Sequence, residues 1–543
     1  MQDEEKTANV QTVPVAVVNA DDEKLRALGY EPQNVLTLLL CWDLHGYHWM
    51  YTIVSQTLSY PDGAISYFWW ISITVSLANG LSSGGPVAIV YGWILSVIMG
   101  MCIAASMGEI ASGFPLAGAL YNYSAALAPP RYRVPICFFT GWMNLLGQLA
   151  ITIAVVYASA ELVIAMAVIG SDFTYVPPAI HTVAIYWAIL ILHYCTNLLP
   201  TRTLSLANQA DVVLLALGTL IIIIVLLAMN DNKNSASFVF ATYSNQTGWS
   251  SNGLAWLLGL LQSCYTLTGY DAAGHMSEET HRSDRTAPLG MTLGVGFSGL
   301  VGLIYIIPLL FCVGDINSVL ITKTGLPAAQ IFYNVAGKRG SLGLLFLVFC
   351  MQYLCGLASV TASSRMCWAF SRDDALPGSK YLKRVWQRNH IPVYSMTFCV
   401  AIEFVVGCIA IGSTTAFFAF TSVTTIALYI SYVIPTLLLN TGGRARFVPG
   451  PFTLGKWSAP IGWIAIAWVT LTSALFVLPN YYPPTAKNMN YASAMMGLYF
   501  ICCGLYWVYK RKTFKGPAGS LAAQKESITV GEYKDILAAK DTK

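Results

Sequence analysis

Apolar runs recur along the whole chain, and short polar segments separate them. A helix needs about 20 apolar residues to cross a bilayer. The runs do not alternate between apolar and polar residues as transmembrane β-strands do. They lie near residues 65–81, 87–111, 136–168, 180–199, 208–229, 253–274, 289–313, 341–369, 393–412, 414–439, 458–479 and 491–509. The pattern therefore predicts an all-α membrane protein with twelve transmembrane helices.

The distribution of Lys and Arg supports this count. Basic residues gather in loops on the cytoplasmic side of membrane proteins. With a cytoplasmic N-terminus, the loop after the eighth run is strongly basic, as are the loops around 131–133, 444–456 and 510–515. Few basic residues fall outside, namely Lys233, Lys323, Lys338, Arg339 and Lys487. This topology places the sequon at Asn245 outside, so we predict glycosylation there.

The chain divides into four regions by composition. Residues 1–33 are polar and acidic and are expected to form a disordered cytoplasmic tail, and residues 512–543 a second one. The membrane-spanning domain is expected at residues 65–511. Residues 34–64 are atypical, because Asp43, His45 and His48 interrupt an apolar stretch. A span there would move every later loop to the other side, so we interpret it as interfacial or as an artefact of the gene model.

Composition excludes several classes of protein. Hydrophobic residues make up 56% of the chain and charged residues 10%, whereas soluble proteins average about 25% charged residues. The net charge of +4 gives no indication of nucleic-acid binding. The sequence has no P-loop, no dinucleotide-binding fingerprint, no HExxH and no CxxC spacing. We therefore expect no enzyme activity, no cofactor and no metal.

The end of the sixth run carries the strongest functional signal. Asp271 follows Gly269 and Tyr270 at the end of this run. A buried acid costs about 2.5–3.5 kcal/mol on insertion scales and is usually functional. Glycines let a membrane helix break and expose backbone groups to a solute. The segment predicts a discontinuous transport helix; the alternative is an interfacial Asp271 that caps the helix.

Several motifs resemble the fungal amino acid/choline transporter family of the APC superfamily, which includes GABA, choline and amino-acid permeases. They are SGGP at 83–86, SMGEI at 106–110, FPLAGALY at 114–121, TGWMN at 140–144, GYDAAGHMSEE at 269–279 and AFSRD at 369–373. The resemblance covers residues 65–510 and implies a LeuT-type fold. In that fold two inverted repeats of five helices, with helices 1 and 6 broken, precede two extra helices.

The resemblance also implies a function. The expected activity is secondary active transport by alternating access of a small amine-containing solute, an amino acid or GABA, with protons as the coupling ion. Alternatives are a choline or quaternary-amine permease and a transport-inactive nutrient sensor that retains the fold. The partners are then the solute, the lipid bilayer and protons. We expect the plasma membrane, with the vacuolar membrane as the alternative.

The candidate substrate-binding residues lie in spans 1, 3 and 6. An aromatic side chain such as Tyr265 could cover a solute or stack on a cation. The tryptophans could instead form an interfacial belt, and the polar residues of span 3 could be interhelical hydrogen bonds. The candidates are Trp69, Trp70, Trp142, Asn144, Gln148, Tyr265, Thr266, Gly269, Tyr270 and Asp271.

Four charged residues are candidates for gating or coupling. Glu109 lies near the cytoplasmic end of span 2, and Glu278 and Glu279 follow span 6. Arg365 in span 8 could pair with one of these acids or with Asp271, or it could snorkel to the interface. His275 is expected to be solvated at the exit of span 6 rather than to relay protons.

Overall fold

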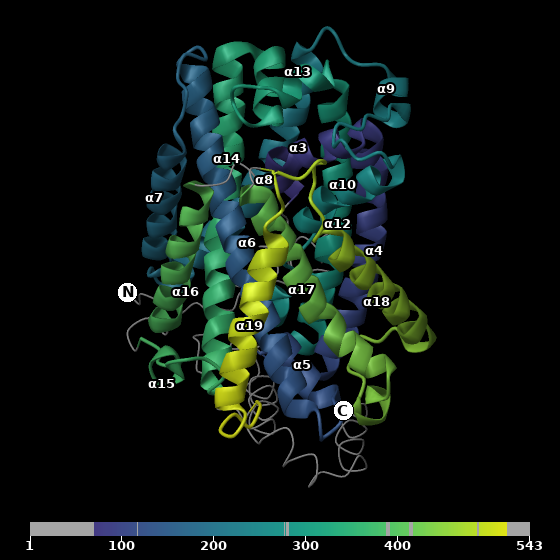
Figure 1. The fold of residues 1–543 in the computed structure, drawn as a ribbon, viewed down its shortest axis with the longest axis vertical. Helices are drawn as coiled ribbons and strands as arrows, with labels where there is room; N and C mark the ends of the chain where they lie inside the picture. The colour runs from purple at the N-terminus through teal and green to yellow at the C-terminus, as the bar shows by residue number, and fades with distance from the viewer. Residues whose placement is uncertain are drawn as a thin grey trace, which may run out of the picture. The chain divides into compact units, whose positions relative to one another are not determined.

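The computed structural model describes residues 70–517, except 117, 276, 278–281, 387–390, 412–415 and 486–487. Trp69, Glu278, Glu279, the region 1–64 and most of the C-terminal tail therefore lie outside the described residues. The described part of the chain is helical and contains no strand, which confirms the predicted class (Figure 1).

Each predicted span coincides with helical structure. In the described residues, nine helices are long and apolar enough to cross a membrane. They are α4 (Gly85–Gly113), α6 (Arg133–Gly170), α7 (Ala179–Asn197), α8 (Thr201–Met229), α12 (Ser283–Phe311), α14 (Pro327–Arg372, with a kink at Gly337), α17 (Ala416–Asn440), α18 (Ser458–Leu475) and α19 (Ala492–Lys510).

Shorter helices occupy the three remaining apolar runs. Span 1 is described from η1 (Trp70–Ser72) and α3 (Ile73–Ser83). Span 6 comprises α10 (Asn252–Thr266) and α11 (Ala272–His275), and span 9 comprises α16 (Val393–Val406) and η2 (Gly407–Ile411). The loops carry α5 (Ala119–Leu127), α9 (Ala236–Ala241), α13 (Ile316–Leu320), α15 (Ser379–Leu382), η3 (Gly443–Arg446) and η4 (Gly455–Trp457).

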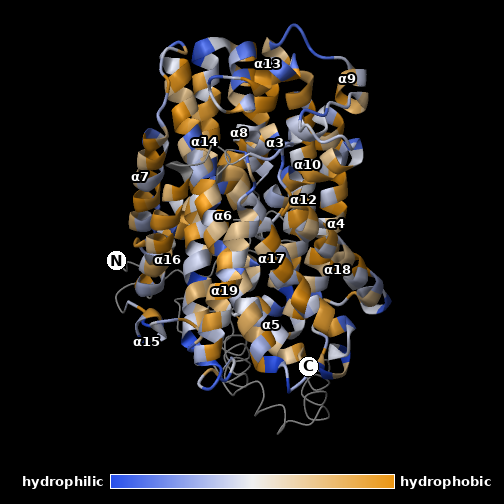
Figure 2. Cartoon of the chain, viewed as in Figure 1, coloured by the Kyte–Doolittle hydropathy of each residue, from blue (hydrophilic) through white to orange (hydrophobic). Residues whose placement is uncertain are grey.

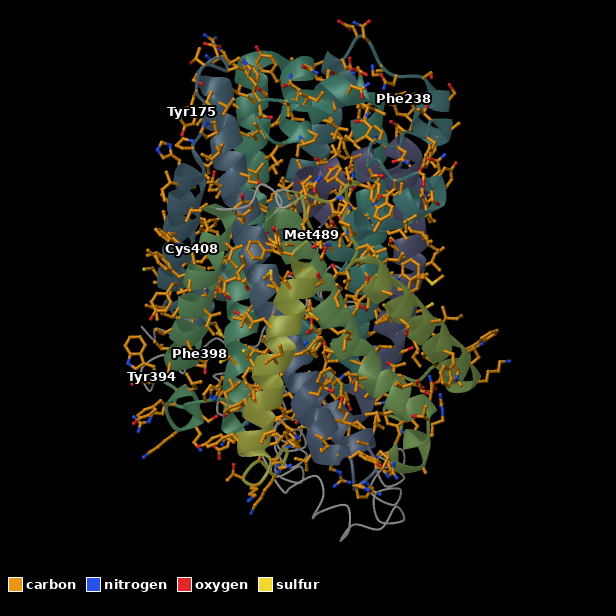
Figure 3. The ribbon with its side chains drawn as sticks, viewed as in Figure 1. Tyr175, Phe238, Tyr394, Phe398, Cys408 and Met489 are labelled. Carbon is orange, nitrogen blue, oxygen red and sulfur yellow. The ribbon has the colours of Figure 1, made fainter. Side chains whose placement is uncertain are left out.

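The surface of the long helices is apolar. Figure 2 shows hydrophobic residues along these helices and hydrophilic residues concentrated in the loops at both ends of the bundle. Leu498 and Leu505 of α19 are 65% and 69% exposed, as suits side chains that face lipid. Tyr175 and Phe238 lie toward one end and Tyr394 toward the other (Figure 3), where aromatic rings are enriched in membrane proteins.

Packing between helices reveals the two repeats. α3 packs on α10, α4 on α12 and α6 on α14, so the first three spans each contact their counterparts in the second repeat. The contact of α6 with α17 likewise has its counterpart in that of α14 with α8. A repeat with an odd number of spans starts the next repeat on the opposite side. The ten-helix core is therefore an inverted repeat, and α18 and α19 are the two extra helices.

The close contact of α4 with α12 depends on small residues. A Cβ atom on Gly302 would lie 2.2 Å from Cζ2 of Trp93, which is fully buried. The Trp93 Nε1 atom also donates a hydrogen bond to the carbonyl oxygen of Gly299 at 2.8 Å. Small residues allow membrane helices to approach closely and pack without a hydrophobic driving force.

We expect Gly302→Ala to destabilise the protein by about 1–3 kcal/mol, because the added methyl group overpacks this contact. The measurement is thermal unfolding in detergent. Gly343→Ala is the matched control: Gly343 lies in α14 and no atom lies within 4 Å of its added Cβ, so stability should change by less than about 1 kcal/mol. Equal melting temperatures for both variants would contradict the predicted contact.

Candidate transport site

Span 6 is interrupted in the interior of the protein. α10 ends at Thr266, residues 267–271 are not helical, and α11 begins at Ala272. Gly269 has a φ of 102°, which glycine adopts without strain. The hydroxyl of Tyr432 in α17 accepts a hydrogen bond from the Gly269 N–H at 3.2 Å. The predicted interruption of span 6 is therefore present, whereas the matching part of span 1 precedes Trp70, outside the described residues.

Asp271 lies at the end of this interruption and is completely buried. Its Oδ2 atom accepts hydrogen bonds from Asn144 Nδ2 at 2.7 Å and from Gln148 Nε2 at 2.9 Å. Its Oδ1 atom accepts one from the Tyr432 hydroxyl at 2.7 Å. Asn144 and Gln148 are four residues apart in α6, so they face Asp271 from successive turns. Of the predicted residues of spans 3 and 6, Asn144, Gln148 and Asp271 therefore meet.

His275 completes this polar cluster. Its Nε2 atom lies 3.3 Å from Asp271 Oδ2 and 3.0 Å from Asn144 Oδ1, and its side chain is buried. Both neighbours are acceptors, so Nε2 carries a proton. The expectation of a solvated His275 is wrong, because the turn of α11 directs residue 275 to the same side as Asp271. The spacing of four residues between them is the signal that identifies the pair.

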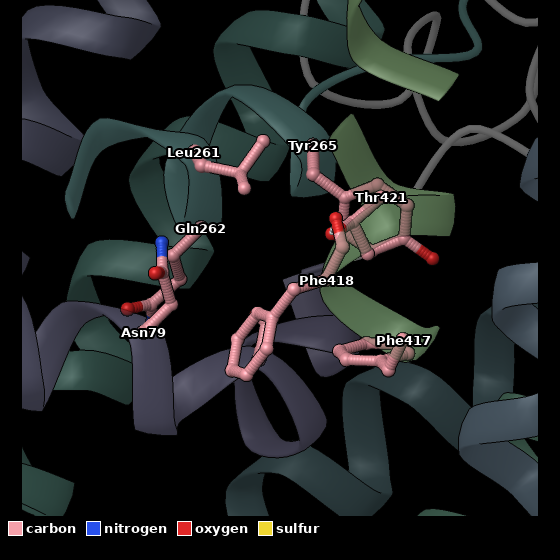
Figure 4. A pocket seen from close by; sticks show the side chains of 8 residues that line it. Asn79, Leu261, Gln262, Tyr265, Phe417, Phe418 and Thr421 are labelled. Atoms are coloured by element: carbon pink, nitrogen blue, oxygen red, sulfur yellow. Dashed lines mark hydrogen bonds between the residues drawn. The ribbon is translucent and has the colours of Figure 1, made fainter. Parts of the chain in front are cut away.

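A small cavity lies beside the outer half of the interrupted helix (Figure 4). Three helices contribute its walls: α3, α10 and α17. The Tyr265 ring meets the Phe417 ring edge to face, with 6.2 Å between centroids. Among the predicted binding residues, Tyr265 lines this cavity. The lining residues are Ser76, Asn79, Leu261, Gln262, Tyr265, Phe417, Phe418 and Thr421.

Comparisons with known proteins agree with this architecture. A family model described as amino acid permease matches residues 55–501. The chain belongs to the amino acid permease family. It is 37% identical over 472 residues to amino-acid permease BAT1 of Arabidopsis thaliana, a match that covers 83% of this chain and 90% of the plant protein.

Two yeast proteins are also similar to this permease. The GABA-specific permease of Saccharomyces cerevisiae is 30% identical over 468 residues, which cover 85% of this chain and 82% of that protein. The choline transporter of the same yeast is 30% identical over 453 residues, which cover 82% and 78%. Family membership and the apolar helices make the chain an integral membrane transporter rather than an enzyme.

Other predicted binding residues of the permease have different surroundings. Trp70 donates from Nε1 to Thr219 Oγ1 at 2.9 Å and packs edge-on against Phe297. Trp142 packs among aromatic rings of α14 and α19, and its carbonyl accepts a hydrogen bond from Tyr499 at 2.6 Å. Their role in binding stays a prediction. Thr266 donates to the carbonyl of Gln262 within α10, and the Tyr270 ring lies 5.0 Å from the Tyr432 ring.

Glu109 of α4 holds the loop between α17 and α18. Its carboxylate is buried and accepts hydrogen bonds from Thr453 Oγ1 at 3.0 Å, from the Leu454 N–H at 3.1 Å and from the Ser458 hydroxyl. These three donors come from the chain that enters α18. Glu109 therefore ties one end of span 2 to the start of span 11.

The remaining predictions concern Arg365 and Asn245. Arg365 is half-buried in α14, and its function as a gate stays a prediction. Asn245 lies in the loop before α10, where its Nδ2 atom donates to the Trp249 carbonyl at 2.9 Å and its Oδ1 accepts from Thr247 Oγ1 at 2.6 Å. Glycosylation of Asn245 stays a prediction.

Several residues of this region escaped the sequence analysis as site residues, among them His275, Tyr432 and Gln262. His275 and Tyr432 bind Asp271 directly, and Gln262 lines the cavity. Tyr432 lies 161 residues from Asp271 in the chain, so their contact depends on how span 10 packs against span 6. A single apolar run does not carry that information.

We expect Asp271→Asn to lower uptake of all solutes at least about tenfold. An amide replaces one acceptor oxygen with an NH2 group, which then faces either the donors of both Asn144 and Gln148 or the Tyr432 hydroxyl, and an unmade buried hydrogen bond costs about 1–3 kcal/mol. The measurement is radiolabelled uptake normalised to the protein in the membrane. Asp172→Asn is the control, because Asp172 is an exposed loop residue paired with Lys338. Unchanged uptake in the Asp271 variant would refute its role.

We expect Glu109→Gln to reduce the maximal transport rate by roughly fivefold, the effect of about 1 kcal/mol, with little change in KM. The amide keeps the size of the side chain but loses an acceptor for the loop, so closure of this end weakens. Initial uptake rates over a range of solute concentrations give both constants. A change confined to KM would contradict this function of Glu109.

Proposed function

We propose that the protein is a secondary active transporter that moves small amine-containing solutes, amino acids or GABA, by alternating access. The interruption of span 6 at residues 267–271 carries this proposal. Non-helical backbone inside a membrane protein is tolerated where it is buried in protein or lines a cavity. An interrupted helix ends its backbone hydrogen-bond ladder at the level of the solute and so presents polar groups and partial charges to it.

The hydrogen bonds of Asp271 give this interruption a mechanical role. They join span 6 to span 3 through Asn144 and Gln148 and to span 10 through Tyr432. In alternating access one group of helices moves against another around the bound solute. We propose that spans 1, 2, 6 and 7 move against spans 3, 4, 5, 8, 9 and 10, and that the Asp271 contacts form the joint between the two groups.

The names of the relatives support the class of solute. The similar proteins include an amino-acid permease, a GABA-specific permease and a choline transporter. All of these solutes carry an amino or quaternary ammonium group on a small carbon skeleton. In this structure protein donors occupy both oxygens of Asp271, so we propose that a solute ammonium competes for that carboxylate only after span 6 has shifted.

Protons are the proposed coupling ion, and the plasma membrane is the proposed location, with the vacuolar membrane as the alternative. The sequence contains no nucleotide-binding motif that would power transport directly, so accumulation has to draw on an ion gradient. The direct contact between Asp271 and His275 at the joint is the proposed point of coupling.

We expect cells that express the protein to accumulate radiolabelled alanine or GABA, and a protonophore to abolish accumulation while leaving exchange intact. A proton gradient that drives uptake has this signature, because exchange needs no net energy. Uptake is compared with that of cells carrying the Asp271→Asn variant. If reconstituted vesicles bind solute but show no counterflow, the protein is a sensor and the proposed function fails.

A further inference from the structure

Two polar groups in the wall of the cavity beside α10 lack partners. Gln262 is 2% exposed, and neither its Nε2 nor its Oε1 atom has a hydrogen-bond partner among the described residues. The same holds for the hydroxyl of Tyr265, which is also 2% exposed. A buried polar group without a partner destabilises a protein, and more so where water is scarce. These two residues therefore need an explanation other than folding.

The other polar residues of the same wall are satisfied. Ser76 donates to the carbonyl of Ser72 at 2.8 Å, and Thr421 donates to that of Phe418 at 3.0 Å. Asn79 donates to the carbonyl of Leu258 and accepts from Asn480, both at 3.3 Å. Gln262 and Tyr265 differ from them and lie three residues apart in α10, so they share one face of that helix.

The facing helix leaves room for the Gln262 amide. A Cβ atom on Gly80 of α3 would lie 2.0 Å from Gln262 Oε1. The Oε1 atom thus lies against α3, which leaves the Nε2 hydrogens to bind an occupant of the cavity. No charged group is present among the lining residues, and the Tyr265 hydroxyl points away from the Gln262 amide on the other side of the cavity (Figure 4).

We propose that Gln262 donates hydrogen bonds to the carboxylate of the solute at an outer subsite, in which Tyr265 forms another part of the wall, and so selects amino acids and GABA over choline. This inference rests on the proposed transport function. A carboxylate presents two oxygens that accept from several donors at once. The trimethylammonium group of choline accepts no hydrogen bond, and its single hydroxyl oxygen is an uncharged acceptor, so choline satisfies these donors less well than a carboxylate does. Sites built on hydrogen bonds strongly reject analogues that lack the partner group.

The position of the subsite follows from the helix. Gln262 precedes the interruption by five residues, one turn and a half of α10, and Tyr265 precedes it by two. The rings of Phe417 and Phe418 complete the wall (Figure 4) and offer an apolar surface to the carbon skeleton of the solute. With the carboxylate at Gln262, the ammonium of the solute would point along α10 toward the interruption.

The test compares kinetic constants for alanine, GABA and choline in cells that express the full chain. We expect Gln262→Leu to raise KM for alanine and GABA roughly tenfold, the effect of an important hydrogen bond, without raising the inhibition constant of choline. Gln262→Glu removes the donors and adds a negative charge, so it should raise KM for both carboxylates further and favour choline. Tyr265→Phe should give a smaller increase in KM, roughly threefold.

Controls separate selection from folding. Gln330→Leu makes the same chemical change at a half-buried residue of α14 whose amide already bonds Thr322 and Asn334, and it should leave KM unchanged. Because the Gln262 amide is unpaired, Gln262→Leu should melt no lower than wild type in detergent. If Gln262→Leu nevertheless fails to reach the membrane, the KM values of Gln262→Glu and Tyr265→Phe still test the subsite.

The failure of the subsite and the failure of the transporter give different results. Suppose that the wild-type protein imports these solutes but the Gln262 variants keep the same ratio of KM for alanine to the inhibition constant of choline. That result overturns the subsite and leaves the transport function standing. If the wild-type protein imports none of the three solutes, the transport function fails. Selectivity is then measured as the thermal shift that each solute gives with purified wild-type and variant proteins, and equal shifts overturn the subsite.

Discussion

A buried carboxylate inside a membrane protein has to be satisfied by the protein itself, and the architecture around Asp271 depends on this constraint. Water cannot supply the donors, and an uncompensated charge in hydrocarbon is costly. Asn144, Gln148, Tyr432 and His275 meet the requirement from α6, α17 and α11. Three elements that are distant in sequence are therefore fixed against one another at the interruption of span 6.

Because of this arrangement, span 6 can move only when other donors replace the partners of Asp271. Asp271 cannot leave Asn144, Gln148 and Tyr432 unless other donors replace them, because each broken contact leaves a buried group unpaired. A solute ammonium is a donor of the right kind, and so is water that enters an opened cavity. The same contacts that hold this conformation together thus link its release to the arrival of a ligand, which is the differential interaction that any ligand-driven shift between states requires.

The loops before and after α18 also hold spans 1, 2 and 6 in this conformation. The loop before α18 binds Glu109 of α4, and the loop after α18 binds α3, where Asn480 donates to Asn79. That second loop also joins the segment before α10, because the Tyr482 N–H donates to the Thr247 carbonyl at 2.7 Å. Spans 1, 2 and 6 are therefore each tied, at an end or in an adjoining loop, to chain that flanks span 11.

The sequence predicts this fold well because its signals are local. The length and apolarity of each run place the helices, and Gly269 beside a membrane acid places the interruption in span 6. The contacts of the site are not local. Tyr432 meets Asp271 only because span 10 packs beside span 6, and the direction in which Trp70 or Trp142 points depends on how each helix is rotated about its axis. An apolar run gives little indication of that rotation when polar residues are few.

The polar side chains of α10 fall into two groups, those with a hydrogen-bond partner and those without one. At the end of α10, the hydroxyls of Thr266 and Thr268 donate hydrogen bonds to the backbone carbonyls of Gln262 and Cys264, four residues earlier. Gln262 and Tyr265, on the preceding turns, have no such partner among the described residues. A membrane helix that pairs its last polar groups yet leaves two earlier ones unpaired sacrifices stability at those positions. Natural proteins retain such a sacrifice chiefly where function needs it, so within α10 the unpaired Gln262 and Tyr265 are the residues to test for contact with a ligand.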